Sequence, residues 1–520
     1  MSGSHTSDLL ILAELSGWHE ASAMVRTVRI ATEAYQDRDD PTPWWPLLLP
    51  TGGYTLAASS PEEHDGSTRV EVGELVLDER PPATDRWATP RLTELLDGMR
   101  LVGWRVPLWA IRRGRPLSER KPLAELTIGE VQQDEWTRVL RARDRALDWA
   151  SLRAAGPTLY AGTGGLEGPE ALRDKGKELL LGRHRHFEPT YLGIDTNGCH
   201  LYSATGGRPM GGYTEIRSRG RRWVPVSGTP ASGQWTQDAS RGLAWVGSGD
   251  VGTVTAAAAG VVDGAGDVIE DAGRVAAYLA TVSGAITSAQ VDAASAAATG
   301  AGRPVALWLA AGDATPLRQM LDYVTRSVRA EWYVGPTSIL TFANRGRPAE
   351  DEPSTGTLRA GIDFTEAVLM DKVTSIPPRR VRVRWGRNAR VMAGNDVLLD
   401  VPAAEKAALA AEYFETVTPD DPALAAACPV EQEAEADTLL STYAAAQAEG
   451  MARLGEGWAP PSQFELPLLR LPTERVGQIV TVIDDAHPVF VSPGRRARVT
   501  VVQVDLAGEE NRLVVIPENV

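Results

Sequence analysis

The chain has 520 residues, of which 43% are hydrophobic and 23% charged, and its formal net charge is −15. This apolar fraction permits packed cores and excludes a disordered protein. The length predicts several domains, because single cores rarely grow beyond about 250–300 residues. The negative charge should repel nucleic acid on average.

Two cysteines, Cys199 and Cys428, lie far apart and form no CxxC motif, so they indicate neither a disulfide framework nor a zinc knuckle. We interpret them as free thiols in a reducing cytoplasm. No stretch reaches 18 apolar residues, so the sequence predicts no transmembrane helix. The apolar run at residues 9–12 has no basic start before it, so we expect no secretory signal.

Tryptophan is unusually frequent, with 15 residues against 6 phenylalanines. Its ring favours places where an apolar body meets a polar edge, such as interfaces and sugar sites, and filling a thin β core is the other interpretation. Trp44 and Trp45 stand together in a proline-rich loop. Such a pair can bind sugar, but it more often plugs the end of a barrel or makes a subunit contact.

The N-terminal part of the chain predicts an arm followed by a β domain. Residues 1–24 read as a loosely held arm with at most a short helix, and residues 25–158 as a first β-barrel-like domain. Its expected elements are strands at 27–31, 69–72, 102–110, 126–131 and 136–143 and a short helix at 92–101. Pro107 suggests an edge or a bulge. Asp144 and Asp148 have arginine neighbours, which favours a salt-bridged turn over acid–base chemistry.

The middle of the chain predicts two modules. Residues 159–262 form a glycine-rich loop and β-hairpin domain, with turns marked by paired glycines. Residues 263–350 form an α+β module. Its clearest helix has Thr315 as N-cap and Pro316 in the first turn, followed by an apolar stripe that ends at Val328. Strands at 331–334 and 338–342 complete the module.

Residues 351–520 predict a second β-rich domain that contains Ala/Glu-rich helices at 403–416 and 431–450. Its last strands are expected at 478–483, 497–506 and 512–516. No internal repeat of 20–50 residues is visible in the sequence.

One strand in this last domain carries an apolar face and an arginine face, because Arg380, Arg382 and Arg384 alternate with apolar residues. Three arginines are too few to hold phosphates against a net charge of −15. We interpret this face as a contact with an acidic neighbour or as an edge strand protected by charge.

Two glycine patterns were weighed as nucleotide sites. Residues 247–252 match GxGxxG, but a dinucleotide site needs a helix next, and the Thr-Val-Thr at 253–255 favours a strand. The Lys175-Gly176-Lys177-Glu178 stretch is no P-loop, because Glu178 replaces the hydroxyl residue that would contact magnesium. We therefore predict no cofactor-binding residues.

His184 and His186 are two residues apart on an expected strand, so they share a face and could ligate a metal, with His200 as a third candidate. Neutral or solvated histidines beside arginines are the default interpretation. GxSxG, HExxH and a papain-like cysteine setting are absent from the sequence. The sequence predicts no catalytic and no metal-binding residues.

The stretch at 159–260 carries a resemblance to a known family. The residues concerned are Gly162–Gly168, Lys175-Gly176-Lys177, Leu181-Gly182-Arg183 with Pro189, and Asp250–Thr255. On these residues the sequence resembles the tail-tip (baseplate) hub proteins of long-tailed bacteriophages and of gene transfer agents. Weaker similarity at 73–77, 315–342 and 476–482 extends the resemblance over most of 25–516.

The resemblance implies a structural virion protein, mainly β and multidomain, with tube-like β-barrel modules and a small helix-containing α+β insert. Each chain of such a hub contains two modules that are similar to tube subunits, so three copies mimic a six-fold ring. The implied partners are further copies in a homotrimer, the distal tail protein, the tape-measure protein and tail fibre or tip proteins. DNA passes through the ring without specific binding, nothing inserts into a membrane, and the tail is assembled in the host bacterial cytoplasm.

Two other functions stay open at this point. The tryptophans and loops motivate a carbohydrate-binding or cell-wall-degrading tail protein involved in host recognition, which as a glycosidase would need two carboxylates about 5–10 Å apart. A nucleotide-dependent enzyme is the third hypothesis.

Overall fold

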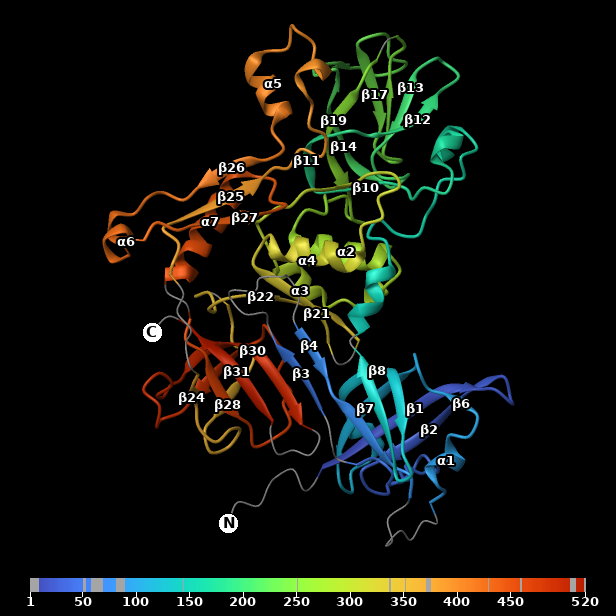
Figure 1. The fold of residues 1–520 in the computed structure, drawn as a ribbon, viewed down its shortest axis with the longest axis vertical. Helices are drawn as coiled ribbons and strands as arrows, with labels where there is room; N and C mark the ends of the chain where they lie inside the picture. The colour runs from blue at the N-terminus through green and yellow to red at the C-terminus, as the bar shows by residue number, and fades with distance from the viewer. Residues whose placement is uncertain are drawn as a thin grey trace.

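A computed structural model of the chain shows mostly strands, arranged in three tiers (Figure 1). Two β barrels lie side by side at the base, helices cross the middle, and two smaller β units stand above them. The structure describes residues 9–49, 53–57, 69–80, 89–143, 145–249, 251–335, 338–350, 352–370, 376–428, 430–458, 461–505 and 511–518. The fold class expected from the sequence, mainly β with an α+β insert, is confirmed.

Barrel 1 is built from strands that pair in the order β2-β1-β7-β8-β9-β5, with β6 added beside β1. The strands are β1 (Leu9–His19), β2 (Met24–Ala31), β5 (Glu74–Asp78), β6 (Met99–Arg100), β7 (Arg105–Arg112), β8 (Lys121–Gln133) and β9 (Thr137–Arg143). Alternation along β1 sends Ile11, Ala13 and Leu15 into the barrel and Leu10 and Leu12 to its outer face.

A short irregular segment closes barrel 1. Trp45 bridges to Ile30 of β2, and Leu48 bridges to Leu77 of β5. The amide of Leu49 also donates to the carbonyl oxygen of Val76, 2.9 Å away. Residues 45–49 therefore fill the gap between the first and last strands of the sheet, and no strand edge remains open at this position.

The expected N-terminal arm is wrong for residues 9–24. They form β1, which pairs with β2, β6 and β7 inside barrel 1. The apolar run at 9–12 explains the difference, because a strand that is buried on both faces reads as a continuous apolar stretch rather than as an alternating one. The expected helix at 92–101 is also shorter than predicted: α1 spans Leu92–Leu95.

Barrel 2 follows the strand order β23-β29-β30-β31-β28-β24, with β3 and β4 attached through β30. The strands are β3 (Gly53–Ala57), β4 (Arg69–Val72), β23 (Thr357–Arg359), β24 (Val368–Leu369), β28 (Phe464–Pro467), β29 (Ile479–Ile483), β30 (Arg495–Asp505) and β31 (Arg512–Pro517). A connecting segment closes this sheet too. The amide of Ala360 donates to Ile483 of β29 at 2.9 Å, and Phe364 bridges to Leu468 beside β28.

The two barrels share a core, and the N-terminal part of the chain supplies two strands to barrel 2. β3 lies in the part of the sequence that we assigned to the first barrel domain, yet it pairs with β30 in barrel 2, with Gly53 opposite Asp505. One continuous apolar cluster joins Leu75 and Leu108 of barrel 1 to Phe364 and Val499 of barrel 2. The domain that we expected at residues 25–158 is therefore not a separate unit, because its strand β3 pairs within barrel 2. Local sequence patterns do not reveal this pairing.

The middle tier contains α2 (Ala272–Val282), α3 (Ala293–Ala298), α4 (Leu317–Arg326), β21 (Ala330–Val334) and β22 (Leu340–Asn344). α4 buries Leu317, Met320, Leu321 and Val324, which confirms the predicted apolar stripe. The helix begins one residue later than expected, with Pro316 at the N-cap, because the Thr315 hydroxyl donates to Asp313 at 2.6 Å instead.

The upper tier holds two β units. The first is formed by a four-stranded sheet, β11-β19-β14-β15, and a five-stranded sheet, β12-β13-β18-β17-β16, with the pair β10-β20 below them. Their bounds are β10 (Leu179–Leu181), β11 (Arg183–Phe187), β12 (Thr190–Ile194), β13 (His200–Ser203), β14 (Met210–Ser218), β15 (Arg221–Arg222), β16 (Val224–Pro225), β17 (Gln234–Asp238), β18 (Leu243–Val246), β19 (Val254–Val261) and β20 (Leu307–Leu309).

The second upper unit is a three-stranded sheet, β26-β25-β27, backed by α7. Its elements, with two nearby short helices, are β25 (Arg380–Trp385), α5 (Ala403–Ala410), β26 (Phe414–Val417), α6 (Pro422–Ala427), β27 (Glu433–Asp437) and α7 (Tyr443–Trp458). Val381, Val383 and Leu454 belong to the apolar core of the middle tier, so this unit packs there and not with barrel 2.

Parts of the predicted Ala/Glu-rich helices are therefore strands. Residues 433–437 read Glu-Ala-Glu-Ala-Asp and pair with β25 in register. Alanine and glutamate favour helices, but the strict alternation places every acidic side chain on one face of the pleat, where β25 supplies arginines. Tertiary pairing overrides local propensity here.

We expect Trp44→Ala to destabilise barrel 1 by about 3–5 kcal/mol, because the closed wall cannot collapse into the cavity left by a buried ring. Trp44 is 1% exposed, whereas the matched control, Trp136, is 45% exposed. Hydrogen exchange of peptides from β1 and β2 in rising urea reports on barrel 1 separately from the rest. Equal protection in Trp44→Ala and Trp136→Ala would contradict the role of the closing segment.

Candidate functional site

Trp44 and Trp45 form part of the wall of barrel 1. Trp44 points outward into a buried cluster with Leu12 and Tyr35, and the guanidinium of Arg29 lies 5.2 Å from the centre of its ring. Trp45 points the other way and packs against the core of the barrel. Because the ring of Trp44 is covered, it cannot stack on a sugar in this fold, and the sugar interpretation of this residue is wrong.

His184 and His186 lie on β11 and both are buried, as their shared face predicts. Burial lowers the pKa of His184 to about 3, helped by the charges of His186 and Arg387. Burial also lowers the pKa of His186 to about 4, helped by Arg217 and Arg390. Both imidazoles are therefore neutral at pH 7.

The third candidate ligand does not join them. His200 begins β13 in the other sheet of the upper unit, and its ring lies 5.9 Å from that of Tyr191. Among the described residues, no group of three or more His, Cys, Asp and Glu side chains is placed to hold a metal ion. The Nε2 atom of His186 is buried without a hydrogen-bond partner.

The glycine motifs serve close packing. The segment after Gly252 leads into strand β19, which confirms the strand that we expected in place of a dinucleotide-site helix. A Cβ atom on Gly247 would lie 1.8 Å from the carbonyl oxygen of Ala231, and one on Gly176 would lie 1.6 Å from the guanidinium of Arg153. Glycine is required at position 247, where the backbone of Ala231 occupies the place of a side chain, whereas at Gly176 the place is filled by the side chain of Arg153.

A polar network holds the loop at 160–178 in place. The Tyr160 hydroxyl donates to the buried carboxylate of Glu178 at 2.6 Å, and the amide of Gly206 donates to the same carboxylate at 3.1 Å. Burial and the charge of Glu178 raise the pKa of Tyr160 far above its ordinary value. Lys177 Nζ lies 2.8 Å from Glu167. The network orders the glycine-rich loop and leaves its charges internally paired.

The arginine face of β25 meets acidic residues of its own chain. β25 is the central strand of its sheet, so the edge-strand interpretation is wrong. Arg382 pairs with Glu433 at 2.5 Å and with Glu415 at 2.8 Å, while Arg384 pairs with Asp437 at 3.2 Å. The arginines hold the pKa of Glu415 below its usual range. We expected an interface with an acidic neighbour here, but the acidic side chains that meet this face belong to β26 and β27 of the same chain.

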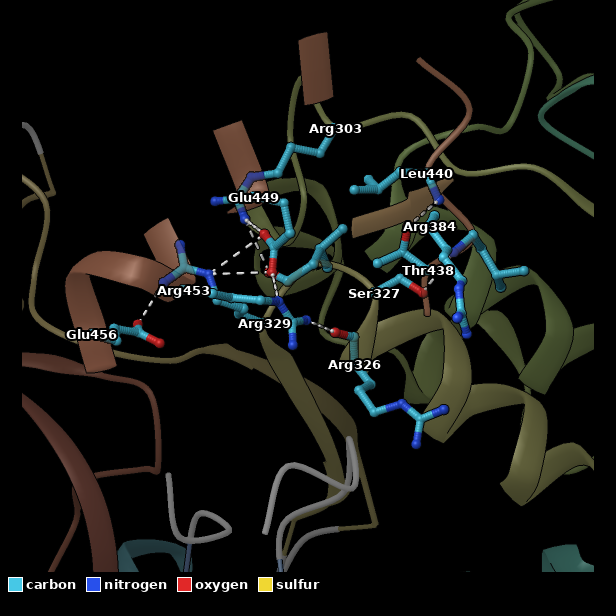
Figure 2. Close-up of polar contacts among 12 residues, drawn as sticks. Arg303, Arg326, Ser327, Arg329, Arg384, Thr438, Leu440, Glu449, Arg453 and Glu456 are labelled. Carbon is cyan, nitrogen blue, oxygen red and sulfur yellow. Dashed lines mark hydrogen bonds and ion pairs between the residues drawn. The ribbon is translucent and has the colours of Figure 1, made fainter. Parts of the chain in front are cut away.

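A second charge cluster is buried where α7 meets the middle tier, and Figure 2 shows three arginines converging on Glu449. The Glu449 carboxylate has no exposure. It lies 2.7 Å from Arg453, 3.2 Å from Arg303 and 3.4 Å from Arg329. Arg329 also contacts Glu456 at 2.5 Å. The cluster joins α7 to two segments that precede it by more than 100 residues.

Sequence reasoning missed this cluster, although a signal was present. Glu449 shares the buried face of α7 with Ala445, Ala446 and Leu454. A carboxylate on an apolar helix face requires a buried cationic partner. The sequence does not indicate which arginines form ion pairs with Glu449, because Arg303 and Arg329 come from another module.

Asp144 of the expected salt-bridged turn and Asp250 of the GxGxxG match lie outside the described residues. Asp148, the other carboxylate of that turn, pairs with Arg143 at the exposed end of β9. No helix in the described ranges is long and apolar enough to cross a membrane.

Comparison with known proteins gives loose matches to solved structures. No protein-family model matches the chain, and no curated protein matches it. A tail protein from Neisseria meningitidis MC58 is 9% identical with a TM-score of 0.40, over 98% of this chain and 96% of that one. The prophage MuSo2 43 kDa tail protein from Shewanella oneidensis is 8% identical with a TM-score of 0.36, over 98% and 97%.

A chain from the virion of a native gene transfer agent particle is 14% identical with a TM-score of 0.38, over 66% of this chain and 85% of that one. These structures belong to the same class of particle as the family that the sequence resembles. All three TM-scores are below 0.5.

We expect Glu449→Gln to destabilise the contact between α7 and the middle tier by about 3–5 kcal/mol, because three buried guanidiniums lose their counter-charge. The matched control is Glu435→Gln, which removes an exposed partner of Arg384 and should cost less than about 1 kcal/mol. Urea unfolding with hydrogen exchange of α7 peptides measures both. Equal effects of the two substitutions would contradict the burial of this cluster.

We expect the upper unit to lose stability as the pH falls from 7 to 5. His184 and His186 stay neutral in the folded chain because their pKa values are lowered to about 3 and about 4. The unfolded chain takes up protons on both below pH 6.5, so folding loses about 2 kcal/mol per histidine by pH 5. His186→Gln should weaken this pH dependence in urea titrations, and an unchanged slope would contradict the assignment.

Proposed function

We propose that the chain is a structural subunit of a phage-type tail, acting as a tail-tip (baseplate) hub. In this proposal a homotrimeric ring joins the tail tube to the distal tip or fibre and lets DNA pass. Its partners are the distal tail protein, the tape-measure protein and fibre or tip proteins, and its location is the virion tail after assembly in the host bacterial cytoplasm. The resemblance at residues 159–260 motivates the proposal, and the base of the molecule supports it.

The supporting observation is the pair of closed barrels in one chain. Each is a sheet closed by a short segment, and the two are fixed to each other by the pairing of β3 with β30 and by one shared core. Three copies in a ring would set six barrels around one axis. A chain of this design can join a six-fold assembly to a three-fold one without changing its fold.

The packing of the barrels limits where a DNA channel can lie in this proposal. Buried side chains such as Leu15, Val106 and Val499 fill their interiors, so neither barrel is a pore. A channel in this proposal lies between copies, on the axis of the ring. The net charge of −15 disfavours adhesion of a polyphosphate to its wall.

We expect the purified full-length chain to form a species with three times the monomer mass of 55.8 kDa. Native mass spectrometry and sedimentation over a range of protein concentrations measure this, and negative-stain images should show a ring with six densities. A chain that remains monomeric at every concentration, and that is absent from tail particles, would overturn the proposal.

The alternative of a cell-wall-degrading protein is tested on the same preparation. We expect no release of reducing ends or peptides from peptidoglycan. Sustained turnover that a single carboxylate substitution abolishes would contradict a structural role.

A further inference from the structure

Each barrel exposes large apolar side chains among its described residues, and one group on each barrel is considered as a contact surface. On barrel 1, the hairpin patch consists of Trp18, Met24 and Val25, which are 42%, 55% and 49% exposed. On barrel 2, the closing-segment patch consists of Ile362, Val368 and Leu369, which are 68%, 44% and 58% exposed. Groups of large exposed apolar side chains mark contact surfaces in soluble proteins more often than isolated ones do.

The hairpin patch lies at the tip of the β1–β2 hairpin. Trp18 and Val25 are opposite each other in the register, so their side chains share a face. Further along β2, Ile30 is bridged by Trp45 and the wall is closed. In the described chain the tip of β2 pairs only with β1, so the N–H and C=O groups of its outer edge are left open beside the patch.

The closing-segment patch lies around β24. Val368 and Leu369 form β24, which pairs with β28 and ends the strand order of its sheet as far as the structure describes it. Ile362 lies in the turn between β23 and β24, two residues after Ala360, whose amide donates to Ile483 of β29. The outer edge of β24 is partly occupied, because the amide of Ala367 donates to Asp484 at 2.9 Å. The exposed apolar side chains therefore lie beside an edge that the chain itself partly covers.

The two patches lie on opposite sides of the base. In Figure 1, β24 is at the left margin of barrel 2, and the β1–β2 hairpin, with β6 beside it, is at the right margin of barrel 1. Two different patches on opposite sides of one subunit suit a heterologous, head-to-tail contact, which closes into a ring when the rotation allows it. An isologous dimer would pair each patch with itself instead.

Charge complements the apolar contact. Arg26 follows Val25 at the exposed tip of β2 and, like Met24, lies on the face of the hairpin opposite to that of Trp18 and Val25. Glu366 lies two residues before Val368 on the exposed part of the closing segment. Among the residues that the structure describes, no ion pair is formed by either side chain. Each patch therefore carries one charge without a partner, and the two charges have opposite sign.

We infer that the hairpin patch of one copy packs against the closing-segment patch of the next copy, with Arg26 facing Glu366, and that this contact forms the ring. The inference rests on the proposed function for the existence of a ring, and it adds which two surfaces meet. It places barrel 1 of each copy next to barrel 2 of its neighbour, so the two kinds of barrel alternate around the axis.

Charge exchange tests the contact in the full-length chain. Arg26→Glu and Glu366→Arg should each raise the dissociation constant of the ring about tenfold or more, because like charges then meet across the contact. The double variant should restore assembly. Arg112→Glu, an exposed charge reversal elsewhere on barrel 1, is the matched control and should assemble as wild type does. Sedimentation across concentrations and native mass spectrometry measure all four.

Cross-linking identifies the surfaces directly. Val25→Cys and Val368→Cys are prepared separately, mixed and oxidised with copper phenanthroline. We expect disulfide-linked pairs in the mixture and none in either variant alone, whereas cross-linking of one variant with itself would indicate an isologous contact and overturn the inference. A wild-type ring that is indifferent to both tests would overturn the inference and leave the proposed function standing. A wild-type chain that never assembles would overturn both.

Discussion

Backbone hydrogen bonding by two short connecting segments decides the form of the base of this molecule. Residues 45–49 bridge β2 to β5, and residues 360–365 join β29 to the region of β28, so two sheets become closed walls around packed cores. Closure removes the strand edges that would otherwise recruit other chains. In the described ranges, strands that end their sheets beside exposed apolar residues include the tip of β2, β12 with Ile194 and β16 with Val224.

Charge in this chain is largely neutralised from within. The arginines of β25 lie between the acidic residues of β26 and β27. Glu449, on the buried face of α7, forms ion pairs with three arginines. These two arrangements differ in their consequences. The exposed ladder contributes little stability because water screens it, whereas the buried cluster fixes one orientation of α7, since any other would leave guanidiniums or a carboxylate uncompensated. In both arrangements the named arginines and carboxylates are paired with each other.

Contacts between distant parts of the sequence tie the tiers together. β3 crosses from the N-terminal region into barrel 2, and the sheet containing β25 packs on the middle tier instead of on the barrel that follows it in sequence. Such exchanges make relative movement of the units costly, because each movement would break sheet pairing or open a core. These contacts hold the two barrels at a fixed spacing.

The sequence by itself determined the fold class, the apolar stripe of α4, the last three strands and the strand after Gly252, because each depends on periodicity or on turn chemistry within one segment. It also showed that His184 and His186 share a face. Only the tertiary structure decided that β1 is a core strand, that residues 433–437 form a strand, that Trp44 is covered and that Arg382 is neutralised by its own chain. Each of these depends on a partner far away in sequence: β7, β25, Trp109 and Glu433. Local propensity carries no information about which distant segment will supply the missing hydrogen bonds, apolar contacts or opposite charges.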